Sequence, residues 1–165
     1  MRDIAPVPLA YSCYVFTSDA RLLLTMRGQA KRTWPGVWTN SCHGRPEPGE
    51  SLVDAVSRGL ALELGLPGVR ADLILPAISH RLPARDGRTV DELNLVYRVV
   101  TDEPPQPDPG EVGDFEWVGW SEFVYAVLAG DISVTPWCRR QVADLRTLGA
   151  DPTRWPVAGR AVSAA

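Results

Sequence analysis

The sequence is poor in histidine, cysteine and lysine. It holds two histidines among 165 residues, so one chain cannot supply a metal site built from three imidazoles. Its three cysteines, Cys13, Cys42 and Cys138, lie far apart without a C-x-x-C pair, which argues against a disulfide framework or a zinc clip. Lys31 is the one lysine among 17 basic residues, which weakly indicates that lysine has a specific role at this position.

Long apolar runs and an excess of charge of one sign are also absent. No apolar stretch reaches the roughly 18 residues that a bilayer crossing requires. Seventeen basic and twenty acidic side chains give a net charge of −3, so the bulk charge indicates neither a nucleic-acid partner nor a membrane surface. Pro6 and Pro8 interrupt the N-terminal segment, which predicts no signal peptide. We therefore expect a cytoplasmic protein.

The overall composition is that of an ordinary globular protein. Hydrophobic residues make up 45% and charged residues 22% of the chain. The length of 165 residues predicts one domain. We expect that domain to cover residues 1–150, followed by a C-terminal tail at 151–165, where the sequence has little pattern.

Local patterns predict strands that surround one capped helix. Strands are expected near residues 9–17, 21–26, 37–42, 71–75, 78–82, 90–100 and 115–120, and later helices at 121–130 and 136–149. The first two strands should form a hairpin, and residues 85–87 carry a second turn signal. Ser51 should cap a helix that ends at Leu64 before Gly65, with Val53, Val56 and Leu60 along one face. This order predicts an α+β fold with a helix packed on a mixed sheet.

Two adjacent segments carry a specific resemblance. The first is Lys31–Ser41, which reads K-R-T-W-P-G-V-W-T-N-S, and the second spaces Gly44, Glu50, Arg58 and the E-L-G-L run from Glu63 as in a degenerate Nudix box. Together they resemble type I isopentenyl diphosphate isomerase, a Nudix-fold family, and the likeness extends to the T-P-W run at 135–137. The resemblance implies the single-domain Nudix fold, with a mixed β-sheet flanked by α-helices.

The positions that bind phosphate in this family are largely retained. The resemblance places Arg27 and Lys31 on the diphosphate, where charge-assisted hydrogen bonds are strong; the alternative is a solvated loop. Glu63 matches a helix glutamate that binds Mg2+ bridged to the diphosphate, against the alternative of an exposed helix-end carboxylate. A family arginine is replaced by Gly59, and the neighbouring Arg58 is a candidate substitute, although it points about 100° away around the helix.

The positions that perform proton transfer in this family carry different residues here. The family protonates and deprotonates a five-carbon diphosphate with a cysteine and a glutamate. The cysteine position is His43 here, and Cys42, one residue earlier on a strand, should point away from the pocket unless a bulge intervenes. The glutamate position is Asn94, while Glu92 is retained from the same Glu-x-Glu motif.

The family's transition-metal site, built from three histidines and two glutamates, is also disrupted. One histidine position is Arg45 and another is Pro8, so no transition metal is expected here. A buried Glu92 would need a positive charge beside it. We therefore predict an Arg45–Glu92 ion pair in place of the metal.

Three aromatic side chains complete the candidate site. His43 can exchange a proton near neutral pH and Asn94 cannot, so His43 is the candidate acid or base. His80 matches the family's active-site tyrosine and is the candidate partner of His43. Trp137 matches the tryptophan that faces the carbocation. The alternatives are hydrogen-bonded structural histidines and a tryptophan that serves only as core packing.

These residues favour an isomerase- or cyclase-type enzyme of isoprenoid and terpenoid biosynthesis. It would act on a prenyl diphosphate by carbocation protonation and deprotonation, with cyclisation or rearrangement in place of ordinary isomerisation. A conventional isopentenyl diphosphate delta-isomerase is the alternative. A Nudix pyrophosphohydrolase is less favoured, because Gly59 and Leu62 replace metal-binding glutamates of the helix. A non-catalytic prenyl-diphosphate binder is the remaining hypothesis.

Overall fold

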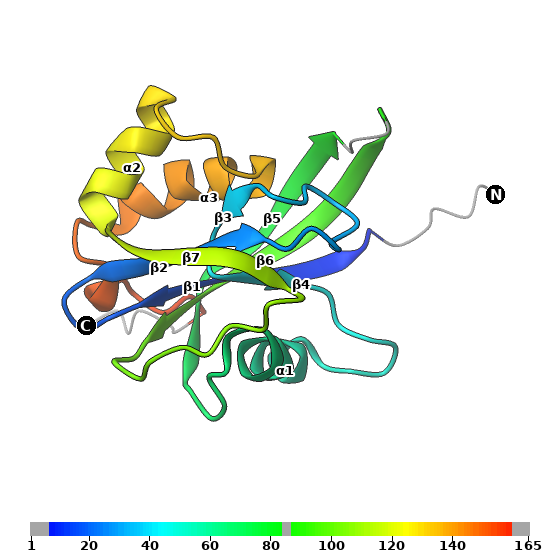
Figure 1. The fold of residues 1–165 in the computed structure, drawn as a ribbon, viewed down its shortest axis with the longest axis horizontal. Helices are drawn as coiled ribbons and strands as arrows, with labels where there is room; N and C mark the ends of the chain where they lie inside the picture. The colour runs from blue at the N-terminus through cyan, green and yellow to red at the C-terminus, as the bar shows by residue number, and fades with distance from the viewer. Residues whose placement is uncertain (1–6, 84–86, 160–165) are drawn as a thin grey trace.

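A mixed seven-stranded sheet forms the centre of the molecule in the computed structural model, which describes residues 7–83 and 87–159 (Figure 1). Its strands are β1 (Leu9–Phe16), β2 (Arg21–Arg27), β3 (Trp38–Thr39), β4 (Cys42–Gly44), β5 (Ala71–Pro83), β6 (Thr89–Val100) and β7 (Val112–Gly119). The main order is β3-β2-β1-β6-β5, with β4 paired to β1 and β7 paired to β2. Strands β1 and β6 run parallel, and the other pairs are antiparallel.

Helices cover both faces of this sheet (Figure 1). Helix α1 (Leu52–Leu64) packs on one face, and α2 (Trp120–Ala129) and α3 (Pro136–Leu145) pack on the other, followed by the short turns η1 (Arg146–Leu148) and η2 (Pro152–Arg154). Each face has its own apolar cluster. The predicted α+β architecture in one domain is therefore confirmed. Among the described residues, no helix combines the length and apolar character that a membrane crossing needs.

Helix α1 forms where the capping residues predict it. The Ser51 side chain accepts a hydrogen bond from the Asp54 amide, and Gly65 ends the helix with a φ of 64°, a conformation that glycine adopts without strain. The face that packs on the sheet includes Val56 and Leu60, whereas Val53 is 65% exposed. The apolar spacing at Val53 therefore overstates the width of the buried face.

The predicted strand at 37–42 is divided into β3 and β4. Between β3 and β4, the side chains of Asn40 and Ser41 make hydrogen bonds to backbone groups in place of strand-to-strand backbone hydrogen bonds. Asn40 donates from Nδ2 to the carbonyls of Cys13 and Cys42, and Ser41 donates from Oγ to the Leu23 carbonyl. Because these bonds fix the crossing from the β2 side to the β1 side, β4 pairs with β1 and carries Cys42 and His43 to the centre of the sheet.

Other predicted elements differ in pairing and extent. The strands expected at 71–75 and 78–82 are one edge strand, β5, whose register shifts on either side of Leu75, next to Pro76, which cannot donate to the ladder. The predicted β1–β2 hairpin is paired at Phe16 and Leu22, because β4 occupies the same edge of β1 from Tyr11 to Cys13, while β6 pairs along the other edge. Most of the turn at 85–87 lies outside the described residues.

The segment from residue 151, expected to be a tail, packs against the domain as far as it is described. Trp155 is 3% exposed and meets Phe16 and Trp120 edge-on, at centroid distances of 5.6 and 5.2 Å. Arg98 donates to the carbonyls of Pro152 and Trp155, at 3.0 and 2.8 Å. An aromatic anchor and two charge-assisted hydrogen bonds hold this segment to the sheet.

Candidate active site

A small cavity opens where β2, β4 and α1 meet. Its volume is about 20 Å³, which is roughly the room of one water molecule. The lining residues are Thr25, Arg27, Lys31, Thr39, Asn40, Ser41, Cys42, His43, Glu63, Glu111 and Val112. The structure thus brings both predicted phosphate anchors, the predicted magnesium ligand and His43 to one cavity.

Arg27 lies at the end of β2 and is 9% exposed. Its guanidinium donates from Nε to the Thr33 carbonyl at 2.8 Å and from Nη2 to Thr33 Oγ1 at 3.0 Å. Its Cζ also lies 5.1 Å from the ring centroid of Trp137, within the range of a cation–π contact. Burial lowers the pKa of Arg27, and the carboxylates of Glu63 and Glu111 oppose that shift. The charge is therefore held in a fixed position at the cavity.

Lys31 extends across the cavity between two carboxylates. Its ammonium contacts Glu111 and lies 3.6 Å from Glu63 Oε1. Burial raises the pKa of Glu63, and the charge of Lys31 opposes that shift. Among the described residues, no group of three or more histidine, cysteine, aspartate or glutamate side chains could hold a metal ion. Glu63 could therefore ligate magnesium only together with oxygens from a bound phosphate or water.

Cys42 and His43 face opposite sides of β4, as strand alternation predicts. The prediction that Cys42 points away from the pocket is wrong, because both residues line the cavity. The Cys42 thiol donates to Glu63 Oε2 at 3.1 Å and lies 3.9 Å from the Tyr11 hydroxyl, within the core under α1. Burial raises the pKa of this thiol well above its usual range. Cys42 is therefore a protonated core residue at the rim of the cavity, on the side away from His43.

Arg58 does not reach the cavity. It donates from Nε and Nη2 to the Glu50 carboxylate, at 2.8 Å each, and does not belong to the lining residues. The lost family arginine has a packing reason instead, since a Cβ at Gly59 would lie 1.9 Å from the Tyr11 hydroxyl. The prediction that Arg58 substitutes in substrate binding is therefore not supported by its position.

The predicted ion pair between Arg45 and Glu92 is confirmed. Arg45 donates from Nη2 to Glu92 Oε2 at 2.8 Å and from Nε to the same oxygen at 3.3 Å. Glu92 is 3% exposed, so its charge is compensated where water cannot reach it. A guanidinium at this point does not fit a cation site. The residues here therefore do not match the transition-metal site of the resembled family.

His43 is held between an aromatic face and two polar groups. Its ring stacks on Trp137, with centroids 4.5 Å apart and an interplanar angle of 21°. Nε2 lies 3.6 Å from Glu92 Oε1, and Nδ1 lies 3.1 Å from Ser12 Oγ. Burial, reinforced by the charges of Arg27 and Arg45, lowers the pKa of His43 to about 3. His43 is therefore a neutral imidazole at neutral pH, and the prediction that it titrates near neutral pH is not supported by its surroundings.

His80 and Asn94 belong to a buried network behind this ring. Asn94 is fully buried, accepts a hydrogen bond from Ser12 Oγ at 2.9 Å and donates to Glu92. Among the described residues, no hydrogen bond or ring contact joins His80 to His43, although the charge of His80 contributes to the lowered pKa of His43. Nε2 of His80 lies 3.4 Å from Gln141 Nε2, and Gln141 in turn contacts Ser12. The prediction that His80 is the direct partner of His43 is therefore not supported by its position.

Sequence reasoning missed four contributors to this region: Tyr11, Ser12, Glu111 and Gln141. Strand alternation in β1 offered a signal for Ser12, because it lies opposite His43 in the β1–β4 pairing. Gln141 had a weaker signal, as a polar residue four positions after Trp137 on the same face of α3. No motif marks Glu111, which reaches Lys31 from a loop 80 positions away.

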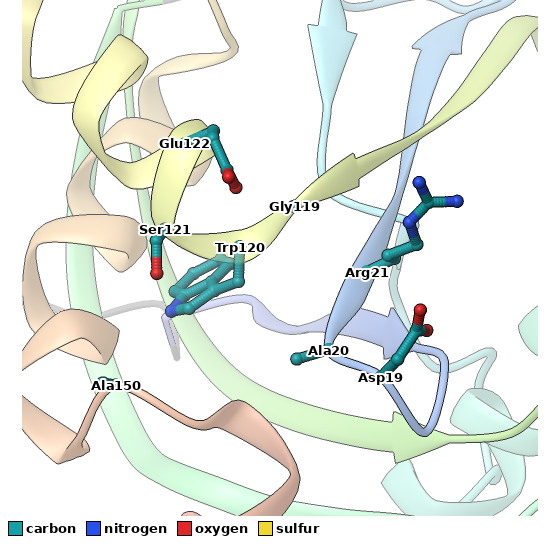
Figure 2. A pocket seen from close by; sticks show the side chains of 8 residues that line it. All are labelled: Asp19, Ala20, Arg21, Gly119, Trp120, Ser121, Glu122 and Ala150. Atoms are coloured by element: carbon teal, nitrogen blue, oxygen red, sulfur yellow. The ribbon is translucent and has the colours of Figure 1, made fainter.

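A second hollow lies at the junction of β7 and α2 (Figure 2). Its eight lining residues include Glu122, which Figure 2 shows in the first turn of α2, and Asp19 and Arg21, which it shows at the turn before β2 and at the start of β2. It shares no lining residue with the cavity beside His43. The predicted site residues therefore have no part in this hollow.

The chain resembles known proteins over most of its length. The model of the NUDIX domain matches residues 6–138. An isopentenyl-diphosphate Delta-isomerase of Saccharopolyspora erythraea is 46% identical over 153 residues, covering 93% of this chain and 79% of that protein. One from Rhizobium rhizogenes is 44% identical over 154 residues, covering 93% and 74%.

Solved structures show the same fold at low identity. A MutT protein from Methanosarcina mazei Go1 superposes with a TM-score of 0.66 at 18% identity, covering 86% of this chain and 93% of that one. A MutT NUDIX hydrolase from Burkholderia pseudomallei superposes with a TM-score of 0.63 at 20% identity, covering 84% and 98%. These likenesses concern the fold alone.

Proposed function

Because this chain belongs to the isopentenyl-diphosphate Delta-isomerase family of NUDIX proteins, we propose that it isomerises a prenyl diphosphate. The reaction would add a proton to one carbon of the double bond and remove a proton from another, so no co-reactant is consumed. One observation carries the proposal: Arg27, Lys31 and His43 line the same cavity. An anion held by the two cations would present its hydrocarbon end to a proton-exchanging side chain.

The relatives favour ordinary isomerisation over the cyclisation or rearrangement that the sequence suggested. Curated proteins 37–46% identical to this chain bear the isomerase name. The changed acid–base residues alone do not require a different product, because a neutral imidazole can remove a proton from a strongly acidic carbocation. Conventional isomerisation is therefore the better proposal for this site.

His43 is the proposed base, whose Nε2 would take the proton that leaves the substrate cation and then return it to solvent. The proton that first adds to the double bond would come from solvent water, because neutral His43 has none to donate at Nε2. Glu92 Oε1 lies 3.6 Å from this nitrogen, so its charge would stabilise the imidazolium once a proton is taken up. Arg45 pairs with the other carboxylate oxygen of Glu92.

Trp137 stacks on the His43 ring and would hold its orientation. The prediction that Trp137 faces the carbocation is not supported by its position, because His43 and Arg27 pack against its ring and it does not line the cavity. In this proposal Cys42 takes no part in proton transfer.

The diphosphate end would be held by charge. Arg27 is already oriented by Thr33, and Lys31 must leave the two glutamates to reach a phosphate. Glu63 is the proposed ligand of a magnesium ion, which would neutralise phosphate charge when bound. The cavity of about 20 Å³ is smaller than a five-carbon diphosphate, so binding requires the cavity to widen.

Incubation with five-, ten-, fifteen- and twenty-carbon prenyl diphosphates, with and without Mg2+, tests the proposal by mass spectrometry and NMR. Interconversion of isopentenyl and dimethylallyl diphosphate is the expected result. His43→Ala should lower kcat by about 100-fold or more while diphosphate binding persists. Arg58→Ala is the matched control outside the cavity and should retain activity.

Three other outcomes would overturn the proposal. Release of phosphate or pyrophosphate would indicate a hydrolase, and a cyclic product would restore the rearrangement hypothesis. Binding of every diphosphate without turnover would indicate a non-catalytic binder. Full activity of His43→Ala would remove His43 from the mechanism.

A further inference from the structure

The hydrogen bonds behind His43 run in one direction. The Tyr14 hydroxyl donates to Gln141 Oε1 at 2.9 Å, which turns the amide nitrogen of Gln141 toward Ser12. Gln141 Nε2 then donates to Ser12 Oγ at 3.0 Å. Both Ser12 and Gln141 are fully buried, so no water competes for these bonds.

The hydroxyl proton of Ser12 is donated to Asn94, on the side away from Gln141. Asn94 donates from Nδ2 to the Glu92 carboxylate, which is acceptor-only when ionised, so Asn94 Oδ1 faces away from Glu92. Ser12 donates to this Oδ1 at 2.9 Å. A serine hydroxyl has one proton and two acceptor sites. With the proton given to Asn94 and one acceptor site filled by Gln141, Ser12 can only accept from a third partner.

That third partner is Nδ1 of His43, 3.1 Å from Ser12 Oγ. We propose that Ser12 is a positioning residue that fixes neutral His43 as its Nδ1–H tautomer, leaving Nε2 free as the atom that exchanges the proton. This inference rests on the proposed function for its catalytic meaning, although the tautomer itself does not depend on activity. In the opposite tautomer, Nε2 would already carry a proton and could not accept one.

The consequence for catalysis follows from where Nε2 points. It faces Glu92 Oε1 at 3.6 Å, so a proton acquired from substrate would sit beside a carboxylate. Removing the Ser12 hydroxyl would free Nδ1 of its acceptor and let an Nε2–H group turn toward Glu92 instead. Ser12→Ala should therefore move the resting proton from Nδ1 to Nε2.

Long-range ¹H–¹⁵N NMR of the imidazole nitrogens tests this, and the chain is suited to it because it has two histidines. The spectrum of His80→Gln identifies the signals of His43, because that variant has no other histidine. We expect the Nδ1–H pattern for His43 in the wild-type protein at neutral pH, and a shift to Nε2–H in Ser12→Ala. Ser12→Thr, which keeps the hydroxyl, should restore the wild-type pattern. Ser41→Ala removes another buried hydroxyl, one that contacts only backbone groups, and should leave the tautomer unchanged.

Kinetics supply the second readout. Ser12→Ala should lower kcat about 10- to 100-fold with little change in KM, and Ser12→Thr should recover most of it. An Nε2–H pattern in the wild-type protein, or an unchanged tautomer in Ser12→Ala, would overturn the inference. If Ser12→Ala does not fold, the wild-type spectrum decides. If no prenyl diphosphate is turned over, the proposed function fails while the tautomer result still stands or falls by NMR.

Discussion

At the scale of single residues, the site is organised by compensation of buried charge. Glu92 is enclosed and depends on Arg45 on one side and Asn94 on the other. His43 is enclosed with cations nearby and remains neutral. Each group therefore has a charge state that its surroundings impose, and each can be tested by removing one partner.

Arg45→Met tests the confirmed ion pair. It leaves the buried Glu92 carboxylate without its cation and should destabilise the fold by about 1–2 kcal/mol. This is less than the roughly 3–5 kcal/mol for breaking a fully buried pair, because Arg45 is half-exposed and solvent screens its charge. Urea unfolding measures the change. Arg81→Met breaks an exposed pair with Asp91 and should cost less than about 0.5 kcal/mol. Equal costs for the two variants would contradict the argument.

The lowered pKa of His43 predicts a pH dependence of stability. In the unfolded chain its pKa is about 6.5, so from pH 7 to pH 5 the unfolded state takes up a proton that the folded state does not. Stability should therefore fall as pH falls, by about 2 kcal/mol over this range from His43 alone. His80, whose pKa burial also lowers, acts in the same direction.

His43→Gln isolates this contribution. Urea unfolding of the wild-type protein and His43→Gln at pH 7 and pH 5 should show a smaller loss of stability at pH 5 for His43→Gln. The variant has no imidazole at position 43 that could take up a proton in the unfolded state. Glu63, whose pKa is raised, acts in the opposite direction but is common to both proteins. A loss of equal size in the two proteins would show that His43 titrates normally.

At the scale of elements, helix α1 approaches β1 and β4 closely because Gly59 has no side chain. The Tyr11 ring from β1 fills the space, with its hydroxyl 1.9 Å and its Cζ 3.0 Å from where a Cβ would be. The same approach lets Glu63 reach Cys42 and Lys31. The packing of one helix thus decides both the loss of a family arginine and the position of the candidate magnesium ligand.

Gly59→Ala should destabilise the protein by about 1–3 kcal/mol, because the new methyl overlaps Tyr11. Tyr11→Phe removes the overlapping oxygen, so the double variant should lose less than the sum of the single losses. Chemical denaturation measures all three. Gly110→Ala, where the nearest atom would be 3.5 Å away, is the control and should change stability by less than about 0.5 kcal/mol. Additive losses would refute the overlap.

At the scale of the whole molecule, the sheet brings together groups from opposite ends of the chain. Arg27 and Lys31 come from β2 and its following loop, His43 from β4, and Trp137 from α3 on the other face. The cavity therefore has a cationic end at Arg27 and Lys31 and an imidazole at His43, with Trp137 stacked behind that imidazole. A diphosphate with a hydrocarbon chain has the same division.

Metal removal tests how the cationic end works. Treatment with a chelator should abolish turnover, and Mg2+ should restore it in the wild-type protein but not in Glu63→Gln. Zn2+ should not restore it, because Arg45 lies where the family's metal site would be. Elemental analysis of the purified protein supplies the independent check. Stoichiometric zinc, lost in Glu92→Gln, would contradict the ion pair as a replacement for the metal.

The sequence by itself determined the features that depend on neighbours along the chain. Ser51 and Gly65 mark the two ends of helix α1, because capping uses backbone groups only a few residues away. The opposite orientations of Cys42 and His43 follow from the two-residue period of a strand. Charge balance was enough to predict the Arg45–Glu92 pair, since a buried carboxylate requires a counter-charge.

Only the tertiary structure decided which distant groups meet. Gln141 reaches Ser12 across 129 positions, and Glu111 reaches Lys31 across 80, through the packing of α3 and of the loop before β7. Neither contact has a local pattern, because it depends on the angle at which helices and loops lie on the sheet. The tautomer of His43 and the separation of His80 from it are set by that packing, which a one-dimensional pattern does not contain.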